Sequence, residues 1–198
     1  QRLALARAWA LQPQVLVLTP TRELAIQVAE AFKTYARRYD SFHVLPIYGG
    51  QSIGIELRQL TRKPQVIVGT PGRVMDHIRR ESLSLSSLRA LVIDEADEML
   101  SMGFLEDMEW IITHTPKEKQ TALFSATIPR EIRRIAQAYL RNPEEIVIRQ
   151  VAAQAALISQ YCWFANGPNK FESLTRVLEL NEFEAVLIFV RTKVATAE

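Results

Sequence analysis

A run of acidic residues, Asp94-Glu95-Ala96-Asp97, directly follows the apolar stretch Leu91–Ile93. A carboxylate at the end of a buried strand has the form of a Walker B element, in which the aspartate holds Mg²⁺, usually through water. The neighbouring glutamate could polarise a water that attacks a γ-phosphate, and Asp97 could bond to a neighbouring element. The simpler alternative is an acidic first turn that suits a helix dipole.

Two further turns each combine a threonine, a helix start and an arginine: Thr19-Pro20-Thr21-Arg22 and Thr70-Pro71-Gly72-Arg73. Free backbone N–H groups, a hydroxyl and an arginine within the first helical turn form a phosphate site. Taken singly, each turn is better explained as an ordinary capped helix. Together with Gly49-Gly50, they favour a site that binds successive phosphates of one nucleic-acid strand. The sequence shows no set of residues suited to contact the bases, so this binding should not depend on the nucleotide sequence.

The tripeptide Ser125-Ala126-Thr127 ends another apolar stretch. Alone it is a capped strand-to-helix turn, but its hydroxyls could bond Asp97 and so link a nucleotide site to a nucleic-acid site. The histidines His43, His77 and His114 lack metal-ligand spacing, so we predict no metal site made by histidines.

The net charge of +2 conceals an asymmetry along the chain. Residues 1–80 hold 12 basic and 5 acidic side chains, whereas residues 81–198 hold 12 basic and 17 acidic ones. A basic half suggests a polyanionic partner, although such an excess is often only solvated surface.

The composition, 48% hydrophobic and 23% charged, excludes a disordered tail, a fibrous repeat and a disulfide scaffold. The single Cys162 fits a reducing cytosol and is expected to be a small buried hydrophobe. The longest strongly apolar stretch, residues 185–190, is too short to span a bilayer. We therefore expect a cytoplasmic protein without a membrane partner.

Short apolar stretches alternate with stretches of helical periodicity, which predicts an α/β fold with a parallel sheet and helices on both faces. Ligands of such sheets collect beyond the carboxyl ends of the strands, where all five polar turns stand. The predicted strands span residues 15–19, 43–48, 66–68, 88–93, 121–125 and 146–148, and the predicted helices span residues 22–39, 55–60, 70–80, 104–114 and 130–140.

Residues 149–159 break this alternation and are interpreted as a linker. It would separate a first domain, residues 1–148, from the start of a second α/β domain, residues 160–198. In the second domain we predict strands over residues 161–164 and 185–190 and a helix over residues 170–180.

The motifs, in this order and spacing, resemble those of the DEAD-box ATP-dependent RNA helicases, and most closely the bacterial cold-shock members. The matching segments are PTRELA at Pro20–Ala25, GG at Gly49-Gly50, TPGR at Thr70–Arg73, DEAD at Asp94–Asp97, SAT at Ser125–Thr127 and a second-domain motif at Leu187–Lys193.

The resemblance implies two RecA-like domains that bind ATP and RNA across a cleft. It implies that Asp94 places Mg²⁺, that Glu95 activates water, and that Asp97, Ser125 and Thr127 couple hydrolysis to RNA. The RNA partner would be bound without regard to sequence, within ribosomal or messenger RNA complexes. The implied RNA-binding residues are Pro20, Thr21, Arg22, Gly49, Gly50, Thr70, Pro71, Gly72, Arg73, Arg191 and Thr192.

One departure is important: the sequence holds no G-x-x-x-x-G-K-[ST] phosphate loop, which the family places before the first strand seen here. We therefore expect an internal piece of a longer enzyme, marginally stable alone and unable to hydrolyse ATP. The alternative is a non-enzymatic RNA-binding module that truly lacks the loop. A DNA-directed helicase of the same superfamily is disfavoured by the RNA-type motif set.

Overall fold

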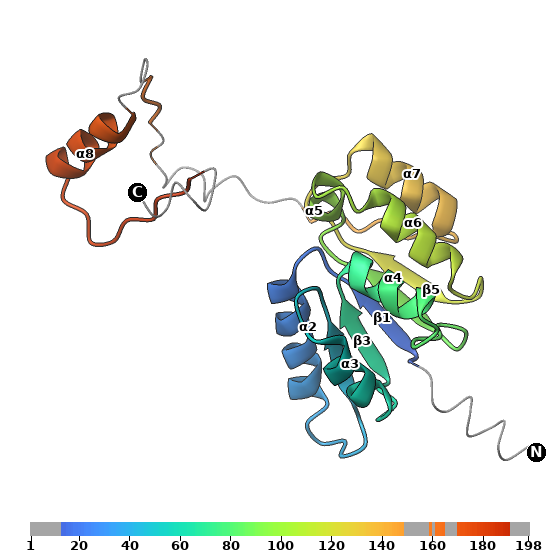
Figure 1. Cartoon of the computed structure of the whole chain (residues 1–198). Coiled ribbons are helices and arrows are strands. Elements are labelled where there is room, and N and C mark those ends of the chain that lie inside the picture. The colour runs from blue at the N-terminus through green and yellow to red at the C-terminus, as the bar shows by residue number, and fades with distance from the viewer. Residues whose placement is uncertain (1–12, 149–158, 160, 165–169, 191–198) are drawn as a thin grey trace, which may run out of the picture. The chain divides into compact units, whose positions relative to one another are not determined.

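The computed structural model describes residues 13–148, 159, 161–164 and 170–190. The chain divides into two compact units, residues 1–145 and 146–198. In the first unit five strands form one sheet in the order β2-β3-β1-β4-β5, and all neighbouring strands are parallel (Figure 1). This confirms the predicted parallel sheet. Its strands are β1 (Val15–Leu18), β2 (Val44–Ile47), β3 (Val66–Gly69), β4 (Ala90–Ile93) and β5 (Gln120–Leu123).

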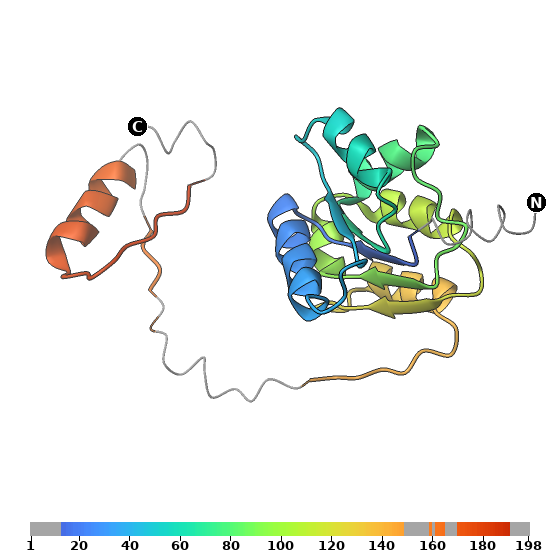
Figure 2. The same ribbon diagram turned by 90° about the horizontal axis from the view of Figure 1, so that it is seen from below.

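The helices of this unit alternate with the strands and cover both faces of the sheet, as predicted (Figures 1 and 2). Helix α2 packs on one face through Ala25 and Ala29. Helices α4 and α6 pack on the opposite face through Val74 and Met108. The helices are α2 (Arg22–Tyr35), α3 (Ile53–Leu60), α4 (Pro71–Arg79), α5 (Ala96–Ser101), α6 (Leu105–Thr113) and α7 (Arg130–Tyr139).

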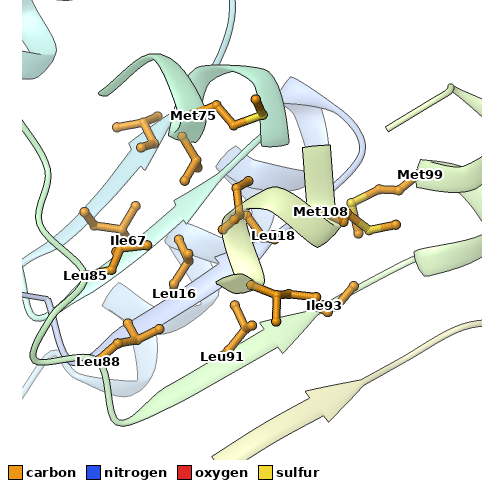
Figure 3. Packing of buried hydrophobic residues seen from close by; sticks show 14 of the residues in the cluster. Leu16, Leu18, Ile67, Met75, Leu85, Leu88, Leu91, Ile93, Met99 and Met108 are labelled. Atoms are coloured by element: carbon orange, nitrogen blue, oxygen red, sulfur yellow. The ribbon is translucent and has the colours of Figure 1, made fainter. Parts of the chain in front are cut away.

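Alternate strand side chains build the core, because successive residues of a strand point to opposite faces. Leu16 and Leu18 of β1 are fully buried and lie beside Ile67 and Ile93 of the neighbouring strands (Figure 3). Val17, between the two leucines, packs on the other face against α2. Each fully buried side chain of this kind stabilises the fold by about 1.5–3 kcal/mol. The strand ends are therefore fixed points from which the polar turns project.

The predicted helix over residues 22–39 is wrong at its carboxyl end. Helix α2 stops at Tyr35, and the N–H of Ala36 donates the last helical bond to the Phe32 carbonyl at 2.9 Å. The chain then turns, with the Tyr39 N–H bonded to the Ala36 carbonyl at 2.8 Å. Tyr35 and Tyr39 are 84% and 71% exposed. Their spacing therefore continued a helical pattern by coincidence, not through burial.

In the second unit the predicted helix is confirmed as α8 (Lys170–Leu180). The strands predicted over residues 146–148, 161–164 and 185–190 are wrong, because none of these residues lies in a strand. A strand needs a neighbour for its N–H and C=O groups, and the five-stranded sheet is the only one in the described part of the chain. Cys162 is exposed rather than buried. Residues 149–158 of the expected linker lie outside the described residues.

None of the helices in the described part of the chain has both the length and the apolar character that a membrane span requires.

Candidate functional site

All five polar turns lie along one edge of the sheet, because parallel strands all end on the same side. This confirms the expectation that the turns share one edge. Backbone bonds tie each turn to its neighbour: the Thr19 N–H donates to the Gly69 carbonyl, and the Asp94 N–H to the Leu18 carbonyl, both at 3.0 Å. Across the sheet the turns follow one another as Gly49-Gly50, Thr70–Arg73, Pro20–Arg22, Asp94–Asp97 and Ser125–Thr127.

The first two acidic residues lie in a strained turn between β4 and α5. Glu95 has φ 54° and ψ 50°, the left-handed conformation that non-glycine residues rarely adopt. Its N–H donates to Asp94 Oδ1 at 3.1 Å, and both side chains are half-buried. Neither carboxylate forms an ion pair with a described residue. The turn thus holds two adjacent carboxylates that no cation of the described residues neutralises.

Asp97 joins the acidic turn to the turn after β5. Its Oδ2 accepts hydrogen bonds from Thr127 Oγ1 at 2.7 Å and from the Thr127 N–H at 2.9 Å. The Asp97 N–H donates to Ser125 Oγ at 3.1 Å, and that hydroxyl donates to the Thr127 carbonyl at 2.6 Å. The predicted bonding between Asp97 and these hydroxyl residues is confirmed. Its part in coupling hydrolysis to RNA stays a prediction.

Two opposing effects set the pKa of the Asp97 carboxyl. Desolvation raises this pKa, but the hydrogen bonds from Thr127 and Ser125 outweigh it and lower the value to about 2. Asp97 is therefore ionised throughout the physiological range. Its second oxygen, Oδ1, is buried without a hydrogen-bond partner among the described residues.

The turn after β1 leads into α2 through a capped helix start. Thr21 Oγ1 accepts a hydrogen bond from the Leu24 N–H at 3.3 Å, so Thr21 caps the N-terminus of α2. Arg22 is exposed, and its guanidinium lies 5.0 Å from the centre of the Tyr48 ring. Stacking over an aromatic face leaves the N–H groups at the rim of a guanidinium available to an anion. Arg22 is thus oriented by the Tyr48 ring and exposed to solvent.

The turns after β2 and β3 present small residues. Gly50 has φ +86°, a conformation that favours glycine, and a Cβ on Gly49, Gly50 or Gly72 would meet nothing within 4 Å. Thr70 precedes α4 in the N-cap position, but its side chain makes no capping bond. The predicted helix start is thus confirmed in position, with Thr70 as the N-cap and Pro71 at the first helical position, although the Thr70 hydroxyl does not cap the helix.

Sequence reasoning missed a buried carboxylate that connects these turns. Glu56 of α3 is fully buried and binds Arg73 and His77 of α4, at 2.7 Å and 2.8 Å. One signal was present: Glu56 stands three residues after Ile53 and four before Leu60, within the apolar stripe of its helix. An acidic residue in such a stripe requires a buried cationic partner.

Gly69, the last residue of β3, was also missed. A Cβ at this position would lie 2.7 Å from Ile47 Cγ1 and 2.9 Å from Val74 Cγ2. The close approach of β2 and α4 to β3 therefore requires a residue without a side chain. Of the remaining predicted site residues, Arg191 and Thr192 lie outside the described residues.

A parallel α/β sheet whose polar turns all follow the carboxyl ends of its strands has the layout in which α/β folds bind their ligands. The family model "DEAD/DEAH box helicase" matches residues 3–135 of the chain. The chain therefore belongs to the DEAD/DEAH box helicase family.

Individual relatives agree with this assignment. The chain is 54% identical over 186 residues to "ATP-dependent RNA helicase DeaD" of Buchnera aphidicola from Schizaphis graminum, covering 94% of this chain and 31% of the relative. It is 50% identical to the Escherichia coli K12 protein of the same name, covering 94% and 30%. The chain thus spans about a third of the length of these relatives.

Solved structures share the fold. A DEAD box protein from Methanococcus jannaschii matches with a TM-score of 0.66 and 39% identity, over 85% of this chain and 45% of that one. A hypothetical ATP-dependent RNA helicase from Sulfolobus tokodaii matches with a TM-score of 0.64 and 39% identity, over 70% and 41%. These similarities bear out the expected RecA-like fold.

Proposed function

We propose that the protein containing this chain is an ATP-dependent RNA helicase, in which RNA-stimulated ATP hydrolysis drives local unwinding of RNA duplexes. The observation that carries this proposal is the layout of the sheet edge. Three turns follow β2, β3 and β1, namely Gly49-Gly50, Thr70–Arg73 and Pro20–Arg22, and we call them the phosphate-type turns. They lie next to the acidic turn after β4, and Asp97 links that acidic turn to the turn after β5. A nucleic-acid strand and a nucleotide would therefore contact one continuous row of turns.

The acidic turn suits a magnesium nucleotide. Asp94 and Glu95 supply hard oxygen atoms at the sheet edge, and no described residue neutralises them by an ion pair. Within the described part of the chain, no three His, Cys, Asp or Glu side chains are arranged so that they could hold a metal ion by themselves. Asp94 would hold Mg²⁺ together with ligands from water and ATP phosphates. Bound magnesium would neutralise charge on the phosphates.

Glu95 would act as the general base. Its left-handed backbone directs the chain away from the strand and holds the side chain half-buried beside Asp94. A carboxylate in this position can accept the proton of the water that attacks the γ-phosphate. Asp97 would then report on the nucleotide, because its carboxylate connects the acidic turn to Thr127 and keeps one buried oxygen unpartnered among the described residues.

RNA would bind through its phosphates and ribose hydroxyls along the turns after β2, β3 and β1, which belong to the basic half of the chain. This binding would not depend on the RNA sequence. Arg22 is exposed there, and the glycines leave open space for a backbone. We propose cytoplasmic ribosomal or messenger RNA complexes as the setting. The residues assigned to this edge are Pro20, Thr21, Arg22, Gly49, Gly50, Thr70, Pro71, Gly72 and Arg73, with Arg191 and Thr192 proposed from the second domain.

The decisive experiment uses the complete product of the gene and its Glu95→Gln variant. We expect ATP turnover to fall about 100-fold or more, the contribution of a general base, while ATP-dependent RNA binding is retained. Glu98→Gln, a change at an exposed neighbour, should leave turnover unchanged. Loss of turnover and binding together would make Glu95 a structural residue. Stimulation by DNA as strong as by RNA would redirect the proposal to DNA.

A non-enzymatic RNA-binding module is the second candidate, because no phosphate-loop motif occurs in the 198 residues. For the same reason we propose that these residues alone do not hydrolyse ATP. The coding sequence upstream of Gln1 separates the two candidates. A phosphate loop about one strand and one helix before Gln14 would establish the enzyme, and its absence from the gene would favour the module.

A further inference from the structure

We infer that Glu56 and His77 are positioning residues for the RNA-binding edge, and that Arg73 acts as the third member of their buried cluster rather than as a phosphate ligand. The inference rests on the proposed binding of RNA at this edge. It refines the residues proposed for that edge: Arg22 is retained as a phosphate ligand, whereas Arg73 shapes the edge without binding phosphate.

Glu56 is the centre of the cluster. Its Oε2 accepts hydrogen bonds from Arg73 Nε at 2.7 Å and from His77 Nε2 at 2.8 Å. Its Oε1 accepts from the Tyr48 N–H at 3.3 Å. The side chains of Glu56 and His77 are 0% exposed. One carboxylate therefore fastens α3 to the first turns of α4 and to the backbone where β2 ends.

Arg73 is held by protein groups and is largely buried. Besides its bond to Glu56, it donates through a terminal nitrogen to the Gln51 carbonyl, and its other terminal nitrogen lies 3.7 Å from Asp76 Oδ2. Its side chain is only 15% exposed. Because two carboxylates already flank the guanidinium and little of it reaches the surface, the site is unfavourable for a phosphate. Arg22, by contrast, is exposed.

Both ring nitrogens of His77 have polar partners. Nε2 lies 2.8 Å from Glu56 Oε2, so the carboxylate accepts the ring N–H at this end. Nδ1 lies 2.8 Å from Ser82 Oγ, and the same hydroxyl donates to the His77 carbonyl at 3.0 Å. The His77 ring is therefore held between Ser82 and the same Glu56 oxygen that binds Arg73.

This buried cluster holds both sides of the Gly49-Gly50 turn. Glu56 binds the Tyr48 N–H just before the two glycines, and Arg73 binds the Gln51 carbonyl just after them. Arg73 itself stands in the first turn of α4. The cluster therefore fixes the separation between the glycine turn and the start of α4. If these turns bind successive phosphates, their spacing is set before RNA arrives.

The test is the salt dependence of binding to a labelled single-stranded oligouridylate, measured on the complete gene product and its Arg73→Gln, Arg73→Lys and Arg22→Gln variants. Loss of one phosphate contact lowers the slope of log K against log salt concentration by about 0.7. We expect this decrease for Arg22→Gln. Arg73→Gln and Arg73→Lys should both weaken binding about tenfold, as for one lost hydrogen bond to a charged group, with the wild-type slope.

The lysine variant separates positioning from direct contact. A phosphate ligand would keep its slope and most of its affinity as lysine, whereas lysine cannot span Glu56 and the Gln51 carbonyl together. A decreased slope for Arg73→Gln with recovery by Arg73→Lys would overturn the inference and leave RNA binding intact. Failure of the wild-type protein to bind RNA would overturn the proposed function itself. Should Arg73→Gln fail to fold, the affinity of Arg73→Lys decides.

A second experiment adds a readout that does not depend on RNA. Nitrogen NMR of histidine-labelled protein, with His77 assigned by its loss in His77→Gln, should show Nε2 protonated, because this nitrogen donates to the Glu56 carboxylate. Glu56→Gln should shift that signal and reproduce the binding defect of Arg73→Gln at an unchanged slope. An unprotonated Nε2 in the wild-type protein, or normal binding by Glu56→Gln, would contradict the buried cluster.

Discussion

The two halves of the sheet edge are held together by different kinds of interaction. On the side of β2 and β3, the turns are fastened by the buried carboxylate of Glu56, which binds Arg73 and His77. On the side of β4 and β5, the Asp97 contacts to Thr127 are solvent-exposed hydrogen bonds. A buried charge resists rearrangement because leaving it unpaired inside the protein is costly, whereas exposed bonds exchange readily with water. We therefore expect the phosphate side, which comprises the turns after β2 and β3, to be rigid and the acidic side to rearrange more easily.

The largest effect should come from removing the buried carboxylate. Glu56→Ala leaves the buried side chains of Arg73 and His77 without the carboxylate that binds both, so we expect it to lower the free energy of unfolding by about 3–5 kcal/mol. Urea unfolding measures this loss. Glu118→Ala, which removes a carboxylate that is 90% exposed, should change stability by less than about 1 kcal/mol. Equal losses of stability from the two substitutions would show that the buried Glu56 carboxylate fastens the domain no more strongly than an exposed one.

A matched pair of glycines tests the steric basis of the phosphate side. Gly69→Ala forces a Cβ to within 2.8 Å of the Ile47 carbonyl oxygen and should destabilise the domain by about 1–3 kcal/mol. Gly72→Ala enters open space in α4 and should leave stability unchanged or raise it by up to about 1 kcal/mol. Thermal unfolding compares the two variants. A tolerated Gly69→Ala would show that β2 and α4 are free to move apart.

A smaller effect is expected on the acidic side. Thr127→Val removes the hydroxyl that donates to Asp97 and should cost about 1 kcal/mol, because water can replace the lost donor at an exposed site. In the complete enzyme the same change should reduce the stimulation of ATP hydrolysis by RNA more than it reduces RNA binding. A loss of stability as large as that of Glu56→Ala would contradict the adjustable character of this half.

The smallest effect is a pH dependence from Asp97. Its folded pKa, about 2, lies below the ordinary value of 3.8, so its ionised form stabilises the fold. That contribution is complete above the ordinary pKa and is lost as the pH falls through about 2. The stability difference between the wild type and Asp97→Asn should therefore be constant near neutrality and shrink below about pH 4. Acid unfolding of both proteins, followed by circular dichroism, measures this stability difference. A difference that grows as the pH falls would contradict a lowered pKa for Asp97.

Local patterns predicted the strands of the first unit because apolar runs between turn residues report burial within a few positions. They failed for residues 146–148, 161–164 and 185–190, because an apolar run becomes a strand only beside a partner. The strained conformation of Glu95 was also invisible, since it arises where β4 passes into α5 rather than from a glycine. For the candidate site, residue types at strand ends were sufficient to identify the turns, but not Glu56, His77 or Gly69.

The amino-acid pattern alone is enough to place each polar turn at the end of a strand and to mark Thr21 as a helix cap, because these features depend on neighbours three or four residues away. Folding decides which turns are adjacent: the turn at Pro20–Arg22 comes first in the chain but lies third along the edge. It also brings Glu56 to His77 across 21 residues and Asp97 to Thr127 across 30. Strand order and buried pairs are settled by packing of the whole domain, and no short stretch of sequence encodes them.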